Sequence, residues 1–122
     1  MTRRLSYEAV LLINQRITGD CVVRDSDGLD SALNRPFQSA FGNDAYPTLL
    51  EKAGALLHGL AAAHAFKDGN KRTAWTTCLA FLELNGVEIE RDEDAAGPFV
   101  IALVEHQEDA RTAALWLAAR VL

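Results

Sequence analysis

Apolar positions recur at helical spacing in the middle of the chain. They share one face between Thr48 and His64, at Leu49, Ala53, Leu56, Leu57 and Leu60. Separations of three, four and seven residues predict a helix that buries this face. Continued at about 100° per residue, the apolar stripe puts His64 near its edge. We therefore expect the imidazole of His64 where the core meets a cleft.

The next stretch, about 70–84, is apolar on almost every face. It contains Ala74, Trp75, Cys78, Leu79, Ala80, Phe81 and Leu82. A helix that is apolar all round is usually central and buried. The Asp68-Gly69 turn precedes it and Asn85-Gly86 ends it. The pattern thus predicts two central helices joined by a short polar turn.

Four further helices are predicted, at about 7–18, 29–34, 95 or 98 to 106, and 109–121. Ser6 is placed as the cap of the first and Gly19 as its end, while Pro36 closes the second. Residues 21–28, dense in turn formers, predict a short loop or hairpin, and Gly42-Asn43-Asp44 predicts a turn. With no repeat or linker, we expect an all-α, single-domain bundle of about six helices over residues 1–122.

Composition narrows the possible partners. The chain has 122 residues, a net charge of -5 and a pI near 5.1, so direct binding to a long nucleic acid is not expected. No apolar run approaches the roughly 18 residues that span a bilayer, and no apolar signal segment follows the basic N-terminus. Two cysteines, Cys21 and Cys78, allow at most one disulfide. We expect a reducing, cytoplasmic setting without membrane contact.

The junction between the two central helices carries the candidate chemistry. A helix start at Asn70 offers unpaired backbone N–H groups and a positive dipole end, which together bind phosphate oxygens. Gly69 lets the backbone approach an anion closely, and Lys71 and Arg72 add positive charge. Each residue also has a common structural role, since Asp-Gly often forms a turn and Lys-Arg is usually a solvated pair. Their combination favours a phosphate site.

Two further side chains suit a reaction on phosphate. Asp68 would repel a lone anion, but it could hold a bridging Mg²⁺, which prefers carboxylate and phosphate oxygens, or simply cap the helix. Histidine titrates near neutral pH, so His64 could take a proton from an attacking hydroxyl, although a histidine at a helix end is often only a cap. The group fits transfer of a phosphoryl or nucleotidyl unit. Phe66 is expected to anchor the turn in the core.

The residues His64-x-Phe66-x-Asp68-Gly69-Asn70-Lys71-Arg72 resemble the signature of the Fic/Doc superfamily in its Doc-toxin form. The likeness extends over roughly residues 20–90. Further segments in family order are Arg24-Asp25, Gly28-Leu29, Ser31-Ala32, Arg35-Pro36, Tyr46-Pro47, Glu51-Lys52-Ala53 and Phe81-Leu82-Glu83-Leu84-Asn85-Gly86. The resemblance implies the helical Fic/Doc fold.

The resemblance also implies roles for individual residues. His64 would be the general base that activates a target hydroxyl, and Asp68 would hold Mg²⁺ against the phosphates of ATP. The phosphates would lie in a nest formed by Gly69, Asn70, Lys71 and Arg72. A flap would align the target segment by main-chain pairing, and its residues here are Val23, Arg24, Asp25 and Gly28.

The type of transfer depends on the branch of the family. Fic proteins that attach AMP typically contain Gly-Asn-Gly-Arg-x-x-Arg, whereas this chain has Lys71 at the second glycine and Trp75 at the last arginine. Ala65 also replaces the proline that is common after the motif histidine. These differences match Doc-like proteins, which resemble kinases: they use ATP to phosphorylate a threonine of elongation factor Tu and so arrest translation.

The sequence lacks the Ser/Thr-x-x-x-Glu-Gly/Asn inhibitory helix of self-restrained Fic proteins, because no Glu precedes Gly or Asn. Restraint would then come from another chain, and Doc-like toxins pair with a Phd-like antitoxin whose disordered tail folds on the toxin. The leading hypothesis is a Doc-like toxin of a toxin-antitoxin system that acts as a kinase of elongation factor Tu. The alternatives are a Fic-like AMP transferase and a catalytically silent module that binds the antitoxin.

Overall fold

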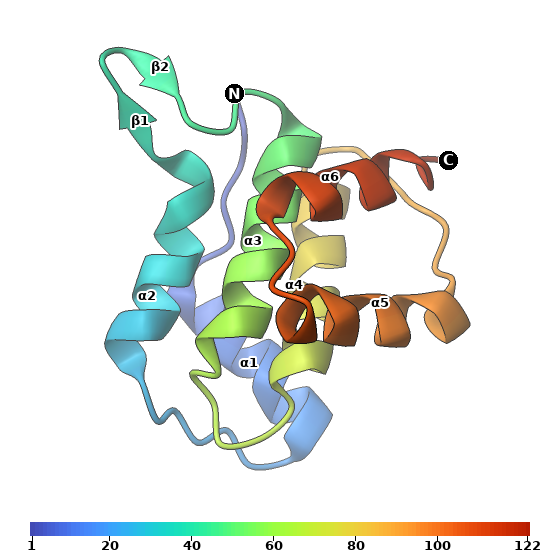
Figure 1. Ribbon diagram of the computed structural model, residues 1–122. Helices are drawn as coiled ribbons and strands as arrows, with labels where there is room; N and C mark the ends of the chain where they lie inside the picture. The colour runs from blue at the N-terminus through green and yellow to red at the C-terminus, as the bar shows by residue number, and fades with distance from the viewer.

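Six α-helices form the body of the molecule in the computed structural model, which describes all residues from 1 to 122 (Figure 1). The helices are α1 (Tyr7–Thr18), α2 (Ser26–Asn34), α3 (Leu49–Ala63), α4 (Asn70–Leu84), α5 (Glu93–Glu105) and α6 (Ala110–Ala118). A 3-10 turn, η1 (Arg35–Phe37), follows α2, and two short strands, β1 (Ser39–Ala40) and β2 (Asn43–Asp44), pair antiparallel. The predicted all-α class with about six helices is confirmed.

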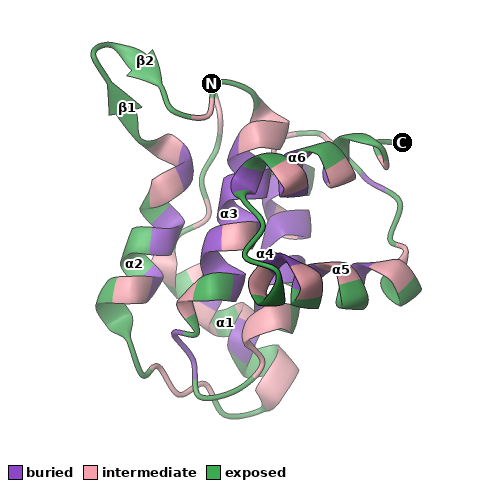
Figure 2. Ribbon diagram, in the orientation of Figure 1, coloured by how far each residue is buried: buried purple, intermediate pink, exposed green.

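The two helices predicted to be central, α3 and α4, form the middle of the bundle (Figure 1). α1 packs on α4, α2 and α6 pack on α3, and α5 contacts both central helices. Burial is densest on α3 and α4 (Figure 2). Every helix adds at least one side chain with under 2% exposure, namely Val10, Leu29, Leu57, Phe81, Leu103 and Leu117. None of the helices is both long and apolar enough to cross a bilayer.

The tightest helix crossing lies between α3 and α6. A Cβ atom added to Gly54 would stand 2.5 Å from the carbonyl oxygen of Ala110 and 2.6 Å from the amide nitrogen of Ala114. Only glycine therefore allows this approach of the two backbones. The contact fixes α3 against α6, and so holds the helix that ends at His64.

Helix ends follow the capping side chains. α1 has its predicted bounds, because the Ser6 hydroxyl accepts from the Ala9 N–H and Gly19 ends the helix with φ +78°. α2 begins three residues earlier than predicted, at Ser26, because the Asp25 carboxylate accepts from the Gly28 N–H. α5 also begins early, since Asp92 caps it and Pro98 is accommodated inside the helix.

The C-terminal helix is shorter than predicted. α6 ends at Ala118, and Val121 instead forms an isolated antiparallel bridge with Ile89. The predicted extended connector at 87–90 therefore has a partner that periodicity alone did not reveal. The bridge ties the chain terminus to the segment between α4 and α5.

A hairpin that the sequence signalled only as a turn lies between η1 and α3. Phe41 and Gly42 occupy its tip with φ +55° and +80°, the signs that a two-residue type I′ turn requires. At its base, Lys52 is only 6% exposed; its ammonium donates to the Tyr46 carbonyl and lies 3.4 Å from the Asp44 carboxylate. The hairpin stands at the start of α3, at the opposite end from His64 (Figure 1).

Candidate active site

The loop between α3 and α4 brings the predicted catalytic and phosphate-binding residues together. A shallow pocket of about 280 Å³ opens there, and none of its lining residues is apolar. The lining consists of His64, Lys67, Asp68, Gly69, Asn70, Lys71 and Arg72. Three cations therefore surround one carboxylate, a balance that suits an anionic ligand.

The loop has a fixed path because its apolar residues are buried. Ala65 is 2% exposed and Phe66 is 4% exposed, and both belong to the main core cluster. His64, which ends α3, adopts a left-handed conformation with φ 47° and ψ 42°. Such a conformation is uncommon for a residue with a side chain, and it persists where the surroundings hold it. Here the buried pair that follows His64 supplies that restraint.

The imidazole of His64 is exposed at the mouth of the pocket and has no hydrogen-bond partner in the protein. This placement differs from a satisfied core histidine and from a helix cap that bonds a free carbonyl. Both ring nitrogens are therefore open to an incoming group.

The start of α4 provides unpaired donors. Ser6, Asp25, Thr48, Asp92 and Asp109 cap the other five α-helices with side-chain oxygens. α4 instead begins after Gly69, which has φ +73° and offers no side-chain cap. The backbone N–H groups of residues 70–72 have no acceptor in the protein. Free amides at a positive helix end, beside Lys71 and Arg72, are suited to bind an anion.

The side chain of Asn70 has a different role from the one predicted. Its Oδ1 accepts from the Phe66 N–H at 2.9 Å, and its Nδ2 donates to the Phe66 carbonyl at 2.8 Å. The side-chain amide thus closes the loop on itself. Only the backbone N–H of Asn70 is left to bind an anion.

Asp68 faces the same pocket. Its Oδ1 accepts from the Gly69 N–H at 2.8 Å, and the side chain is otherwise open to solvent. No group of three or more His, Cys, Asp or Glu side chains is arranged to hold a metal. A single carboxylate nonetheless fits Mg²⁺, which usually keeps several waters and takes other oxygens from substrate phosphates.

The predicted flap is an extended segment that pairs with the motif loop. Val23 and Phe66 form an antiparallel bridge flanked by bonds from the Arg24 N–H to the Ala65 carbonyl (2.7 Å) and from the Lys67 N–H to the Val22 carbonyl (2.9 Å). In such a pair, the N–H and C=O of the bridged residue point away from the partner. Those of Val23 have no acceptor or donor, so this edge is open.

The flap is therefore shorter than the sequence suggested, and it is no hairpin of its own. Val23 and Arg24 lie beside the motif loop, and the Asp25 N–H also donates to the Ala65 carbonyl, at 3.1 Å. The structure thus joins three of the four predicted flap residues to the motif loop. The Asp25 carboxylate also caps α2 by accepting from the Gly28 N–H, so Gly28 lies in the first turn of that helix.

Sequence reasoning missed one residue that supports the loop of the site from outside the pocket. Asn14 of α1 is 1% exposed and bonds both the Asp68 carbonyl and the Thr73 hydroxyl. The available signal was an amide at helical spacing from Val10 and Ile17, on the face where an apolar residue is expected. A buried amide indicates a specific polar partner.

Thiol chemistry has no support in the fold. Burial raises the pKa of Cys78 to about 12, so its thiol stays protonated. Burial and the neighbouring Asp20 carboxylate both raise the pKa of Cys21.

Trp75 stands at the position of the last arginine in AMP-transferring motifs. It is 7% exposed and packs edge to face on Trp116, with the ring centroids 5.7 Å apart. An aromatic contact thus occupies the place of a phosphate-binding cation.

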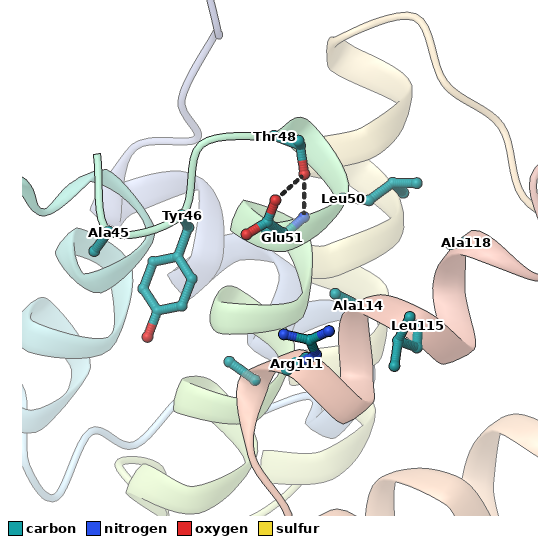
Figure 3. A pocket seen from close by; sticks show the side chains of 10 residues that line it. Ala45, Tyr46, Thr48, Leu50, Glu51, Arg111, Ala114, Leu115 and Ala118 are labelled. Carbon is teal, nitrogen blue, oxygen red and sulfur yellow. Dashed lines mark hydrogen bonds between the residues drawn. The ribbon is translucent and has the colours of Figure 1, made fainter. Parts of the chain in front are cut away.

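A larger groove than the pocket at His64 lies elsewhere, at the start of α3. It has a volume of about 510 Å³ and is mostly apolar (Figure 3). Its lining residues are Ala45, Tyr46, Thr48, Leu50, Glu51, Ala110, Arg111, Ala114, Leu115 and Ala118. Arg111 is the only cation there, and the Thr48 hydroxyl accepts from the Glu51 N–H and donates to the Glu51 carboxylate. This groove contains one cation, against three in the pocket at His64.

A helical protein with unpaired amides, cations, a free imidazole and a carboxylate in one pocket has features that suit the transfer of phosphate-bearing groups. The sequence profile of the Fic/DOC family matches residues 4–82, which include the whole pocket. The chain is also similar to Toxin Doc of Mycolicibacterium smegmatis, with 47% identity over 95 residues that cover 77% of this chain and 73% of that protein. The chain belongs to the Fic/DOC family, a family of transferases, and it is of the Doc type.

Proposed function

We propose that this protein is a Doc-like toxin that uses ATP to phosphorylate a threonine hydroxyl of elongation factor Tu and thereby arrests translation. The observation that carries the proposal is the uncapped start of α4, where three free N–H groups and two cations adjoin His64 and Asp68. The similarity to Toxin Doc supports the same conclusion.

In this reaction, the imidazole of His64 accepts the proton of the target hydroxyl. The hydroxyl oxygen attacks the γ-phosphorus of ATP, the bond from that phosphorus to the bridging oxygen breaks, and ADP leaves with the bonding electrons. The amides of residues 70–72, with Lys71 and Arg72, hold the phosphate oxygens and neutralise their charge. Positioning and charge stabilisation supply most of the catalysis.

Asp68 is the residue that would hold Mg²⁺. Bound Mg²⁺ supplies positive charge that screens the phosphates from the carboxylate and from the incoming oxygen. The bond from the Gly69 N–H fixes one carboxylate oxygen, which leaves the other free for a ligand. The same arrangement keeps the carboxylate within the pocket that contains Lys71.

The target segment would bind along the flap. The unpaired N–H and C=O of Val23 offer one residue of strand edge, next to a motif loop that already pairs with the flap. An extended peptide can add to such an edge through main-chain bonds, largely independent of its side chains. This mode would bring a threonine of the target toward His64.

Lys71 and Trp75 favour phosphoryl over nucleotidyl transfer. Lys71 stands where AMP-transferring motifs have glycine, and its side chain adds bulk and charge to the pocket. Trp75 packs against Trp116 and carries no positive charge, so it cannot replace the phosphate contact of the last arginine in AMP-transferring motifs. Both features would change how the nucleotide lies across the amides of α4.

Restraint of the toxin would come from a Phd-like antitoxin in the cytoplasm. None of the six helices in residues 1–122 carries the inhibitory motif of the self-restrained Fic type. An antitoxin tail that folds on the toxin would meet this need by coupled folding and binding.

Labelled ATP tests the proposal. Purified protein is incubated with elongation factor Tu and ATP labelled at either the γ- or the α-phosphate, with His64→Ala as the control. Label from the γ-phosphate on the target, absent with His64→Ala, is the expected result. Label from the α-phosphate would indicate an AMP transferase. No label on the target, from a protein that still binds the antitoxin in a separate assay, would indicate a silent binding module.

A further inference from the structure

A buried amide on α1 contacts the loop that carries the site. Asn14 is 1% exposed, and its Nδ2 donates to the Asp68 carbonyl and to the Thr73 hydroxyl, both at 3.0 Å. Both hydrogens of the amide are therefore used. The two acceptors lie on either side of the first turn of α4, so one side chain spans the start of that helix.

The bond to Asp68 orients the peptide that joins Asp68 to Gly69. In a trans peptide, the C=O and the N–H point in opposite directions. Because Asn14 holds the carbonyl toward α1, the Gly69 N–H points away from α1, where it bonds Asp68 Oδ1 at 2.8 Å. A contact in the core thus determines the direction in which the carboxylate of Asp68 is held.

The neighbouring surface of α1 leaves little room for the loop to move. A Cβ atom on Gly69 would lie 2.7 Å from Thr18 Cγ2 and 3.5 Å from Asn14 Nδ2. The Thr18 hydroxyl donates to the Asn14 carbonyl at 2.9 Å, which holds this side chain in place. Gly69 is therefore packed closely against α1, and its left-handed conformation, with φ +73°, immediately precedes α4.

We propose that Asn14 is a positioning residue of the phosphate site: it holds the Asp68-Gly69 peptide so that the Asp68 carboxylate and the free amides of α4 face the same ligand. The inference rests on the proposed function, because the ligand is taken to be Mg·ATP. Asn14 lies outside the motif and does not touch the pocket. Its effect is transmitted through one peptide group.

Three variants separate positioning from general stability. Asn14→Ala removes both bonds, and Thr73→Val removes one of them with almost no change of shape. Thr77→Val is the matched control, since Thr77 is buried on the same helix, one turn further along, and its hydroxyl has no hydrogen-bond partner. Mg·ATP affinity is measured by calorimetry well below the melting temperature of each variant, and exchange of the Gly69 amide hydrogen is measured by NMR.

We expect Asn14→Ala to weaken Mg·ATP binding about tenfold, which corresponds to about 1.4 kcal/mol, and to speed exchange at Gly69. Thr73→Val should weaken binding about threefold, while Thr77→Val should match the wild type. Wild-type affinity and exchange in Asn14→Ala would overturn the proposal, as would equal losses in Thr73→Val and Thr77→Val. If Asn14→Ala does not fold, the comparison of Mg·ATP affinity between Thr73→Val and Thr77→Val tests the proposal.

Failure of the proposed function gives a different result. In that case the wild type binds no Mg·ATP, and exchange at Gly69 decides the role of Asn14 by itself. Faster exchange in Asn14→Ala and Thr73→Val, but not in Thr77→Val, would still support positioning of the peptide. Unchanged exchange in these two variants would overturn it.

Discussion

Replacing Asn70 with alanine should loosen the loop that carries the site. The side chain of Asn70 makes two bonds to the backbone of Phe66, at 2.9 and 2.8 Å, and these bonds close the turn between His64 and α4. Alanine removes both bonds without adding bulk. The Phe66 N–H and C=O are then left without partners in a partly buried position.

The expected cost follows from these two bonds. A net hydrogen bond contributes about 0.5–1.5 kcal/mol, and a buried group left unpaired costs more. The better helix propensity of alanine offsets roughly 0.5 kcal/mol of this cost. The free energy of unfolding should therefore fall by about 2 kcal/mol, which for a domain of this size lowers Tm by about 6–10 °C.

Thermal unfolding followed by circular dichroism measures this effect, with Asn43→Ala as the control. Asn43 is exposed in the hairpin and makes only one long bond, 3.4 Å, to the Phe41 carbonyl, so its variant should unfold within about 2 °C of the wild type. The Asn70→Ala protein should also bind Mg·ATP more weakly. A Tm equal to that of the Asn43→Ala protein would refute the reasoning, because the two bonds would then contribute nothing.

Three other predictions concern single side chains. Burial lowers the pKa of His58, and so does the Arg35 guanidinium, which lies 2.9 Å from Nδ1. The folded protein is therefore more stable above about pH 6.5, and this stability is lost as the pH falls toward the lower pKa of the folded state. Urea unfolding at pH 7.5 and pH 5 should show the loss, and His58→Gln should make the difference between the two pH values smaller. Phe66→Ala should cost about 3–5 kcal/mol in the same urea assay, because the side chain is 4% exposed, whereas Phe66→Leu should cost far less. Lys71→Gly should open the pocket and shift the transferred label from the γ- toward the α-phosphate of ATP; unchanged products would mean that Lys71 does not set the type of transfer.

Local signals were enough to predict the helices whose ends are set by nearby residues. α1 and α4 have their predicted bounds, since Ser6, Gly19 and the Asp68-Gly69 turn act within a few residues. α2 was predicted too short because residues 24–28 are dense in turn formers, whereas the Asp25 carboxylate caps the helix. Turns and helix caps draw on the same residue types, so the sequence could not separate them.

Long-range pairing was the part that the sequence could not show. The bridges from Val23 to Phe66 and from Ile89 to Val121 each join segments more than 30 residues apart, and no local pattern marks either one. The motif was enough to predict which residues lie at the site. It could not show that the Asn70 side chain bonds the backbone of Phe66, because those bonds depend on the path of the loop. The contact from Asn14 likewise exists only once α1 packs against α4.

Titration of the ¹⁵N-labelled protein with Mg·ATP, followed by NMR, tests most directly whether the start of α4 is the phosphate site. The account predicts saturable shifts of the backbone amides of residues 70–72, whose N–H groups have no acceptor in the free protein, and loss of these shifts when Lys71 and Arg72 are both replaced by alanine. Shifts centred instead on the apolar groove around Tyr46 and Leu115, or no shifts at residues 70–72, would contradict it.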